Sequence, residues 1–525
     1  MNSFDYALVV GYLVALVGLG YFYREQADRK DYFLGGQSMG WFPLSLSTMA
    51  TQLSAISFIS APAFVGIREG GGLIWLSYEL AVPLAMILLM WVIMPKLYDA
   101  GFVSIYEFLE DHFDKYTRFL ISVVFQVSRA FGTGITIYAV ALILENLMGM
   151  PFWAAVSIVG VVTAVYSLQG GMKAVVYADA AQMIIIFLGI FLCAAFGLYH
   201  LGGVDVFLEN LDTSRLDAIR FSSLGFDGDE FGLFPMLFGG LVLYASYYGC
   251  DQTQAQRIIS AKDGKTVSQI LLANGLMRFP MVLLYCLMGL IVGTLFVVSP
   301  DFSAQEFAAQ PDRMIPTFIV TYLPHGIIGV LVVAILASAM SSLSSVINSL
   351  SAVTIEDLAM LRGGELSEKQ YVFWSRFSAL AWSALILGFS FFGGAIADTV
   401  IEAINKVGSM FYGPILAVFL LAIGFRNVSA RGANWGIVSG VGLNLYLWLG
   451  EPQIFWFWWN VTGLLSAMLV ALFVSRLVDG RKIEFAPRAR LDGVPKAQMI
   501  TLGVAFTAIL AIIIGIGPVF RAIVG

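Results

Sequence analysis

The chain has 525 residues, of which 59% are hydrophobic and only 12% carry a charge, and its mean hydropathy is +0.84. These values exclude a soluble domain as the main body and predict an all-α integral membrane protein, because a membrane-spanning helix needs about 20 apolar residues. The net charge of −6 indicates no particular class of partner.

About fourteen apolar segments follow one another, joined by connections too short to form a separate soluble domain. They cover residues 5–23, 41–67, 73–98, 118–147, 152–168, 173–201, 233–250, 266–299, 325–358, 371–393, 399–425, 431–450, 453–478 and 498–520. The N-terminal residues lack the basic stretch of a signal peptide, so we expect the first segment to remain as a span.

The basic residues predict the orientation in the membrane. With the N-terminus outside, four of the 29 basic residues would lie within spans and 20 would face the cytoplasm. The external loops would hold Arg68, Arg215, Arg220, Arg313 and Arg521. Because cytoplasmic loops carry an excess of Lys and Arg, we expect a multi-pass protein of the cell membrane with both termini extracytoplasmic.

Two segments contain residues that disfavour a straight membrane helix. Segment 41–67 has prolines near its ends and hydroxyl and amide groups midway, and segment 233–250, five spans later, is rich in glycine. Irregular backbone at depth is tolerated where it lines a cavity, and matching interruptions in two halves indicate a transport site. The pattern predicts inverted five-helix repeats over 41–201 and 233–425. Around them lie an N-terminal helix with its loop (1–40), an external loop (202–232) and peripheral helices (426–525).

A dense set of hydroxyls lies at 334–349, inside an otherwise apolar span. At about 100° per residue, five serines share roughly 100° of arc and Ser344 lies on the flank. The five are Ser338, Ser341, Ser342, Ser345 and Ser349. Uncharged oxygens suit a hard monovalent cation that must later be released, and a polar stripe at membrane depth marks a pathway. Close helix packing through small residues is the alternative, but six hydroxyls favour the cation site.

Signals for enzymatic or redox chemistry are missing from the sequence. Cys193, Cys250 and Cys286 have no paired spacing, and the three histidines lie at span ends or in loops. No phosphate-binding loop or zinc-protease motif is present. We therefore expect no enzyme and no cofactor, which leaves a transporter, a channel, a membrane redox subunit or a solute sensor.

Several motifs lie in order along nearly the whole chain. They are the run 170–175 followed by Asp179, the run 251–257 with Asp251-Gln252 and Gln256-Arg257, the serine helix ending in Asn348-Ser349, and the run 413–421. With these motifs the chain resembles the sodium:solute symporter family, which includes bacterial sodium/galactose and sodium/sialic acid transporters. The resemblance implies a sodium-coupled symporter that works by alternating access. It also implies a LeuT-like fold of ten core helices, in which the first core helix is discontinuous.

The resemblance implies a general sodium site between the break in the first core helix and the serine helix. The matching residues are Ala50 and Leu53, through their carbonyl oxygens, with Ser338, Ser341 and Ser342. Some relatives hold a second sodium ion, and the matching residues are Asp179, Ser341, Ser344 and Ser345. An ion pair with Arg129 or a structural hydrogen bond is the alternative role for Asp179.

The residues that match substrate sites point to two solute classes. Glu79 and Asn405 match polar contacts of the sugar transporters, and Tyr247, with Tyr78, matches the gate over the solute. Arg129 matches the arginine that sialic acid transporters direct at a carboxylate, which a guanidinium fork suits well. Near Arg129 the same pattern places Gln52, Ser54 and Ser57. We expect an organic anion of the sialic acid or carboxylate type, with a sugar or polyol as the alternative if Arg129 is structural. Whether Arg129 contacts the solute or pairs with Glu79 or Asp179 stays open in the sequence. Sodium, the solute and the lipid bilayer are the expected partners, without nucleic acid or an obligatory protein partner.

Overall fold

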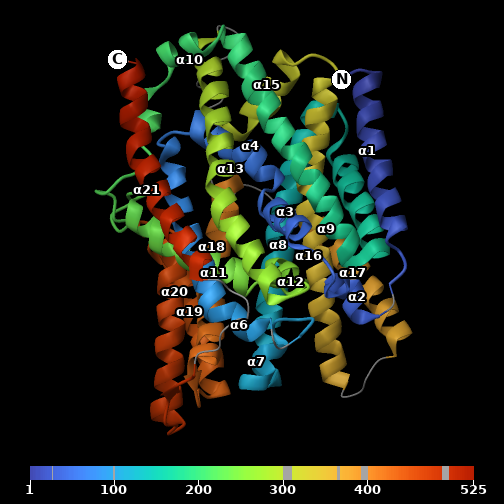
Figure 1. Cartoon of the computed structure of the whole chain (residues 1–525), viewed down its shortest axis with the longest axis vertical. Helices are drawn as coiled ribbons and strands as arrows, with labels where there is room; N and C mark the ends of the chain where they lie inside the picture. The colour runs from blue at the N-terminus through green and yellow to red at the C-terminus, as the bar shows by residue number, and fades with distance from the viewer. Residues whose placement is uncertain are drawn as a thin grey trace.

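The computed structural model describes residues 1–26, 28–98, 101–299, 310–362, 367–391, 400–487 and 496–524. These residues are almost entirely helical, which confirms the predicted all-α class (Figure 1). The strands among them are β1 (Phe425–Arg426) and β2 (Glu484–Phe485), which pair antiparallel at one end of the helix bundle.

Ten helical runs of the described chain are long and apolar enough to cross a membrane, and the bent pair α3 and α4 gives an eleventh candidate. These spans are α1 (Ser3–Phe22), α3 (Trp41–Gln52) with α4 (Ala55–Gly66), the run through α5 (Ala81–Leu88) and α6 (Met94–Leu97), α8 (Lys115–Met148), α9 (Phe152–Leu201), α13 (Gly264–Val298), α16 (Ile327–Arg362), α17 (Glu368–Ser390), α18 (Val400–Gly424), α20 (Trp458–Phe473) and α21 (Lys496–Val524). The other helices are α2 (Arg29–Leu34), α7 (Glu107–His112), α10 (Val204–Asn210), α11 (Gly240–Gly249), α12 (Gln252–Ile259), α15 (Met314–Tyr322) and α19 (Ala430–Gly450). Tighter or wider helical turns cover Gly35–Gln37, Leu73–Leu80, Leu89–Ile93, Thr213–Leu216, Pro235–Gly239, Pro311–Arg313 and Val474–Val478.

The count of fourteen spans and the boundaries of the two repeats stay predictions. The segment expected at 233–250 is helical through Gly249, and its break lies at Cys250–Asp251, where α11 gives way to α12. The break directly follows Gly249, at the end of the predicted segment, and Pro235–Gly239 near its start forms a wider helical turn.

The first part of α9 runs beside α1 in the same direction. Near the start of α1, the hydroxyl of Tyr6 donates to the carbonyl of Met148, just before α9 begins, at 3.2 Å. Near the end of α1, Gly20 packs against the backbone of Tyr166 on α9. The two helices therefore cross the bundle together.

The second part of α9 returns, because the helix is broken at Gly171. This residue has φ 54° and ψ −151°, close to a region that only glycine occupies. The second arm ends near the start of α1. The ring of His200 lies 2.7 Å from the carbonyl of Tyr322, and His325, three residues after Tyr322, lies 3.3 Å from Asp5 of α1. Residues 152–168 and 173–201 are thus two antiparallel arms, as expected for two separate spans.

Both chain ends lie at the same end of the molecule (Figure 1). Near the C-terminus, Arg521 of α21 forms an ion pair with Asp217 in the loop after α10. The structure therefore places both termini on the same side, while the extracytoplasmic location of that side stays a prediction.

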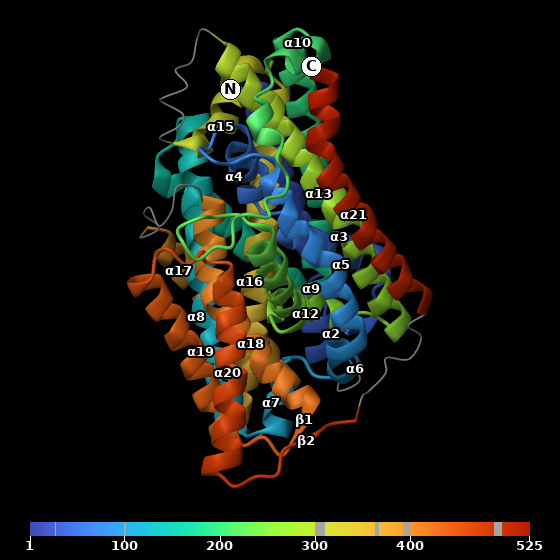
Figure 2. The same ribbon diagram turned by 90° about the vertical axis from the view of Figure 1, so that its left-hand side faces the viewer.

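Burial separates an inner group of helices from a peripheral one. In the most apolar part of α16, 83% of the residues are buried, against 17% for α21 and 22% for α1 and α20. Figure 2 shows α16 between α17 and α21, which lie at opposite edges of the molecule. The serine-rich helix is thus enclosed by other helices instead of facing lipid.

Replacing Gly171 with alanine tests the turn between the two arms of α9. A Cβ at this position would lie 2.6 Å from the carbonyl oxygen of Tyr32, and the backbone conformation is unfavourable for any other residue. We expect Gly171→Ala to destabilise the protein by about 1–3 kcal/mol, measured as a lower midpoint of thermal unfolding in detergent. Gly18→Ala is the matched control, because a Cβ at Gly18 meets no atom within 4 Å. Equal midpoints for the two variants would contradict this account of the turn.

Candidate functional site

A break between α3 and α4 opens the backbone in the middle of the bundle. The two helices are bent by 56°, and Leu53 between them has φ −83° and ψ 72°. Helix α4 starts a new set of hydrogen bonds, in which the amide of Ser57 donates to the carbonyl of Ser54 at 2.9 Å. The last carbonyls of α3 lack partners within their own helix, so they can accept from other groups. The predicted discontinuity of the first core helix is confirmed.

The serine face of α16 lies against this break. The hydroxyl of Ser342 is 3.4 Å from the carbonyl of Thr51 and 3.3 Å from that of Ser338. One turn further along α16, the hydroxyls of Ser345 and Thr51 are 3.1 Å apart. Of the residues expected at the general sodium site, Ser342 contacts the break through Thr51, and Ala50 and Leu53 are fully buried on α3 and beside it.

The carboxylate of Asp179 is the centre of a second polar cluster. Its Oδ1 accepts from the hydroxyl of Ser341 and its Oδ2 from that of Ser47, both at 2.6 Å. The Nη2 of Arg257 lies 2.9 Å from Oδ2. Ser345 belongs to the cluster through its contact with Arg257.

Of the two alternative roles for Asp179, the ion pair with Arg129 is absent, because the cationic partner of Asp179 is Arg257 and Arg129 forms an ion pair with Asp251. The hydrogen bonds from Ser341 and Ser47 agree with the other alternative. Ser344, also expected at this site, donates to the carbonyl of Ser341 at 3.0 Å. Arg257 follows an apolar segment, so its place in the sequence predicts a cytoplasmic position, but in the structure it is 1% exposed. The short helix α12 carries it back into the bundle, a reversal that hydropathy does not reveal.

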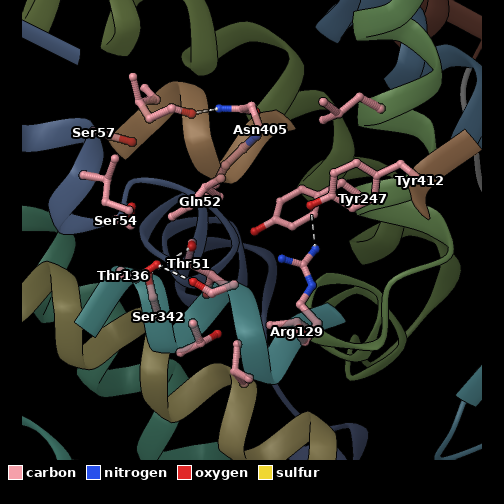
Figure 3. A pocket seen from close by; sticks show the side chains of 18 of the residues that line it. Thr51, Gln52, Ser54, Ser57, Arg129, Thr136, Tyr247, Ser342, Asn405 and Tyr412 are labelled. Atoms are coloured by element: carbon pink, nitrogen blue, oxygen red, sulfur yellow. Dashed lines mark hydrogen bonds between the residues drawn. The ribbon is translucent and has the colours of Figure 1, made fainter. Parts of the chain in front are cut away.

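A cavity of about 150 Å³ lies next to the break. Six of the seven expected solute contacts line it, from α8, α11, α18 and the two halves of the broken helix (Figure 3). They are Gln52, Ser54, Ser57, Arg129, Tyr247 and Asn405. Tyr78 and Ser342 also line it, so the expected gate and the serine helix border the same space.

Glu79 is the exception among the expected solute contacts. Its side chain is fully buried outside the lining, where Tyr244 donates to it at 2.9 Å and the Nε of Arg278 lies at 3.3 Å. Both carboxylate oxygens thus have partners within the protein. The alternative in which Glu79 pairs with Arg129 is absent, because Glu79 forms its ion pair with Arg278.

Arg129 lies at the edge of the cavity among aromatic side chains. It forms an ion pair with Asp251, and its Nη2 donates to the hydroxyl of Tyr412 at 3.1 Å. The guanidinium carbon is 4.7 Å from the ring centre of Tyr247, within the range of a cation–π contact. Figure 3 shows this guanidinium directed toward the two tyrosines.

Several lining residues were missed by the sequence analysis. They include Thr51, Thr133, Thr136, Thr253, Arg278 and Tyr412. Thr133 and Thr136 follow Arg129 at intervals of four and seven, which places them on the same helical face; this spacing could have identified them. Tyr412 and Arg278 carry no such local signal, because helices distant in sequence bring them to the cavity.

Comparison with known proteins places this site in a family. The model of the sodium:solute symporter family matches residues 32–440. The chain is 30% identical to sodium-coupled monocarboxylate transporter 1 of Xenopus laevis, over 84% of this chain and 70% of that protein. It is 30% identical to the human protein of the same name, over 85% and 73%. With the human sodium/iodide cotransporter it shares 27% identity, over 86% and 70%.

Solved structures show the same fold. A Na+-coupled sialic acid symporter superposes with a TM-score of 0.81 at 22% sequence identity, covering 93% of this chain and 100% of that one. A nucleobase-cation-symport-1 family transporter superposes with a TM-score of 0.52 at 14% identity, covering 86% and 94%. The predicted LeuT-like fold is thereby confirmed.

The pair of Arg129 and Asp251 provides a test of the cavity wall. Asp251→Asn keeps a good N-cap for α12, where Oδ1 accepts from the amide of Thr253, but removes the negative charge. We expect a loss of about 3 kcal/mol, because the guanidinium is left without its counter-charge, measured as a lower midpoint of thermal unfolding.

Asp217→Asn is the control for this prediction. Its partner Arg521 and Asp217 itself have side chains about half exposed, at 44% and 50%. The expected effect is below about 1 kcal/mol. If Asp251→Asn lowered the midpoint of thermal unfolding no more than Asp217→Asn does, the buried pair would contribute no more to stability than the exposed one.

Proposed function

Because the chain belongs to the sodium:solute symporter family and is a sodium-coupled solute symporter, we propose that it imports a small organic anion with a single carboxylate. The observation that carries the proposal is the guanidinium of Arg129 at the wall of the cavity. A guanidinium has five N–H groups, and Asp251 and Tyr412 do not use all of them. Donors remain for a solute carboxylate.

The groups beside the cavity favour an anion over a sugar. The cavity has a volume of about 150 Å³. Glu79, the carboxylate expected to accept from sugar hydroxyls, is already bound by Tyr244 and Arg278. Relatives named as monocarboxylate and iodide transporters also handle anions.

The general sodium site is proposed at the break of α3 and α4. The carbonyls of Ala50 and Leu53 and the oxygens of Ser338, Ser341 and Ser342 would hold the ion. Helices α3 and α16 meet there at Thr51 and Ser342, and Gln52 and Ser54 border the cavity beside the same break. An ion that fixes this break would therefore also fix solute contacts, which couples the two ligands. Tyr78 and Tyr247 would gate access to the solute.

The protein would act in the cell membrane with both termini extracytoplasmic. The excess of basic residues on the opposite side supports this orientation. We expect the chain to need no protein partner, so purified protein in liposomes suffices for each assay of uptake.

A thermal-shift screen tests the solute class. Monocarboxylates such as lactate and propionate, sugars and sialic acid are added to the purified protein in sodium or potassium chloride. We expect only the monocarboxylates to raise the unfolding midpoint, and only in sodium, because a ligand stabilises the state that binds it. Arg129→Gln should abolish this stabilisation, whereas Lys406→Gln, which removes a cation outside the cavity lining, should retain it. Stabilisation by a sugar that survives in Arg129→Gln would contradict the proposal.

Ser342→Ala tests the general sodium site. Loss of one oxygen ligand should raise the sodium concentration for half-maximal uptake at least about tenfold, since a contact with a charge is worth about 1.5–3 kcal/mol. Uptake of lactate into proteoliposomes is measured against sodium concentration. Ser383→Ala on α17 is the control, because its hydroxyl also bonds to its own helix, at 2.7 Å from the carbonyl of Ala379. Unchanged sodium dependence in Ser342→Ala would refute the assignment.

A further inference from the structure

A buried arginine binds the carboxylate that the family resemblance assigns to a second sodium ion. The Nη2 of Arg257 lies 2.9 Å from Asp179 Oδ2, and its Nε donates to the hydroxyl oxygen of Ser47 at 2.8 Å. Nη2 also contacts the hydroxyl oxygen of Ser345. Arg257 is 1% exposed and Asp179 is fully buried.

The arginine contacts two of the oxygens that a second sodium ion would use. Asp179 Oδ2 and the oxygen of Ser345 both face Arg257, and Asp179 Oδ1 accepts from Ser341 at 2.6 Å. The hydroxyl proton of Ser345 goes to the carbonyl of Ser341 at 2.7 Å. These oxygens therefore already have donors, and a sodium ion here would have to displace N–H groups.

The charge of the cluster is already balanced. A guanidinium stays protonated in proteins, so Arg257 and Asp179 together are neutral. A sodium ion between them would place two cations on one carboxylate at membrane depth, where net charge is most unfavourable.

Helix α12 is fixed in this position by bonds that do not involve Asp179. The hydroxyl of Thr253 lies 3.0 Å from that of Ser349, and the amide of Gln256 donates to Asn348 at 2.7 Å. Both partners belong to α16, the helix that carries Ser345. The backbone that supports Arg257 is thus attached to the same helix as the proposed ion ligands.

We propose that Arg257 is a tethered cation that takes the place of the second sodium ion, so that this symporter binds one sodium ion, at the general site. The inference rests on the general site of the proposed function. Asp179 then belongs to an internal ion pair, and Ser342 is a ligand of the single sodium ion at the general site.

Counting bound sodium tests this inference without any solute. Equilibrium binding of ²²Na⁺ to the purified chain is measured at constant ionic strength, with potassium replacing sodium. We expect about one ion per wild-type chain, and about two for Arg257→Gln, because the substitution leaves the carboxylate of Asp179 without a counter-charge. Asp179→Asn in the Arg257→Gln background should return the count to one.

Arg257→Lys is the control, because it retains the tethered charge and should retain a count of one. Monodispersity in size-exclusion chromatography shows whether each variant is folded. A count of two for the wild type, or of one for folded Arg257→Gln, would overturn the inference. If Arg257→Gln does not fold, the wild-type count alone decides. The number of bound sodium ions is measured without solute, so it does not depend on which solute the protein transports. An error in the proposed substrate can therefore be told apart from an error in the role of Arg257.

Discussion

The contact between the broken helix and the serine face of α16 is the interaction on which the proposed transport site depends. Backbone carbonyls released at membrane depth must find partners within the protein, because lipid offers none. Helix α16 supplies hydroxyls at that position, and surrounding helices exclude lipid from it. The cavity, the predicted ion ligands and the aromatic gate residues are all arranged around this contact.

Three carboxylates near this contact are neutralised by three arginines. Asp179 pairs with Arg257, Glu79 with Arg278 and Asp251 with Arg129. Isolated charges at this depth are unfavourable, and removing one partner of a buried pair costs several kcal/mol. The cations and carboxylates of these pairs differ in access to the cavity: Arg129 and Arg278 line it, while Asp179 and Glu79 are fully buried. The cavity wall thus carries cations and none of the three carboxylates, which is why a carboxylate-bearing solute is a better candidate than a sugar.

The number of sodium ions decides what the transporter can accumulate. One sodium ion with a monovalent anion moves no net charge, and a tenfold sodium gradient then supplies about 1.4 kcal/mol, enough for tenfold accumulation. A second sodium ion would add the free energy of the sodium gradient once more. At a membrane potential of 100 mV it would also add about 2.3 kcal/mol for the net charge that is moved. With Arg257 as a tethered cation, the proposed import of a monocarboxylate would be electroneutral and would depend on the sodium gradient alone.

The sequence by itself determined the features that arise from local pattern. Hydropathy gave the all-helical membrane class and separated segments 152–168 and 173–201, between which Gly171 lies. Proline and hydroxyl content located the break at 41–67, and helical periodicity placed the serines of α16 on one face. Tertiary structure alone decided which arginine neutralises which carboxylate. Arg129 is 122 residues from Asp251, Arg257 is 78 from Asp179 and Arg278 is 199 from Glu79. A charged side chain takes the partner that helix packing brings near it, and neither spacing nor composition encodes that proximity.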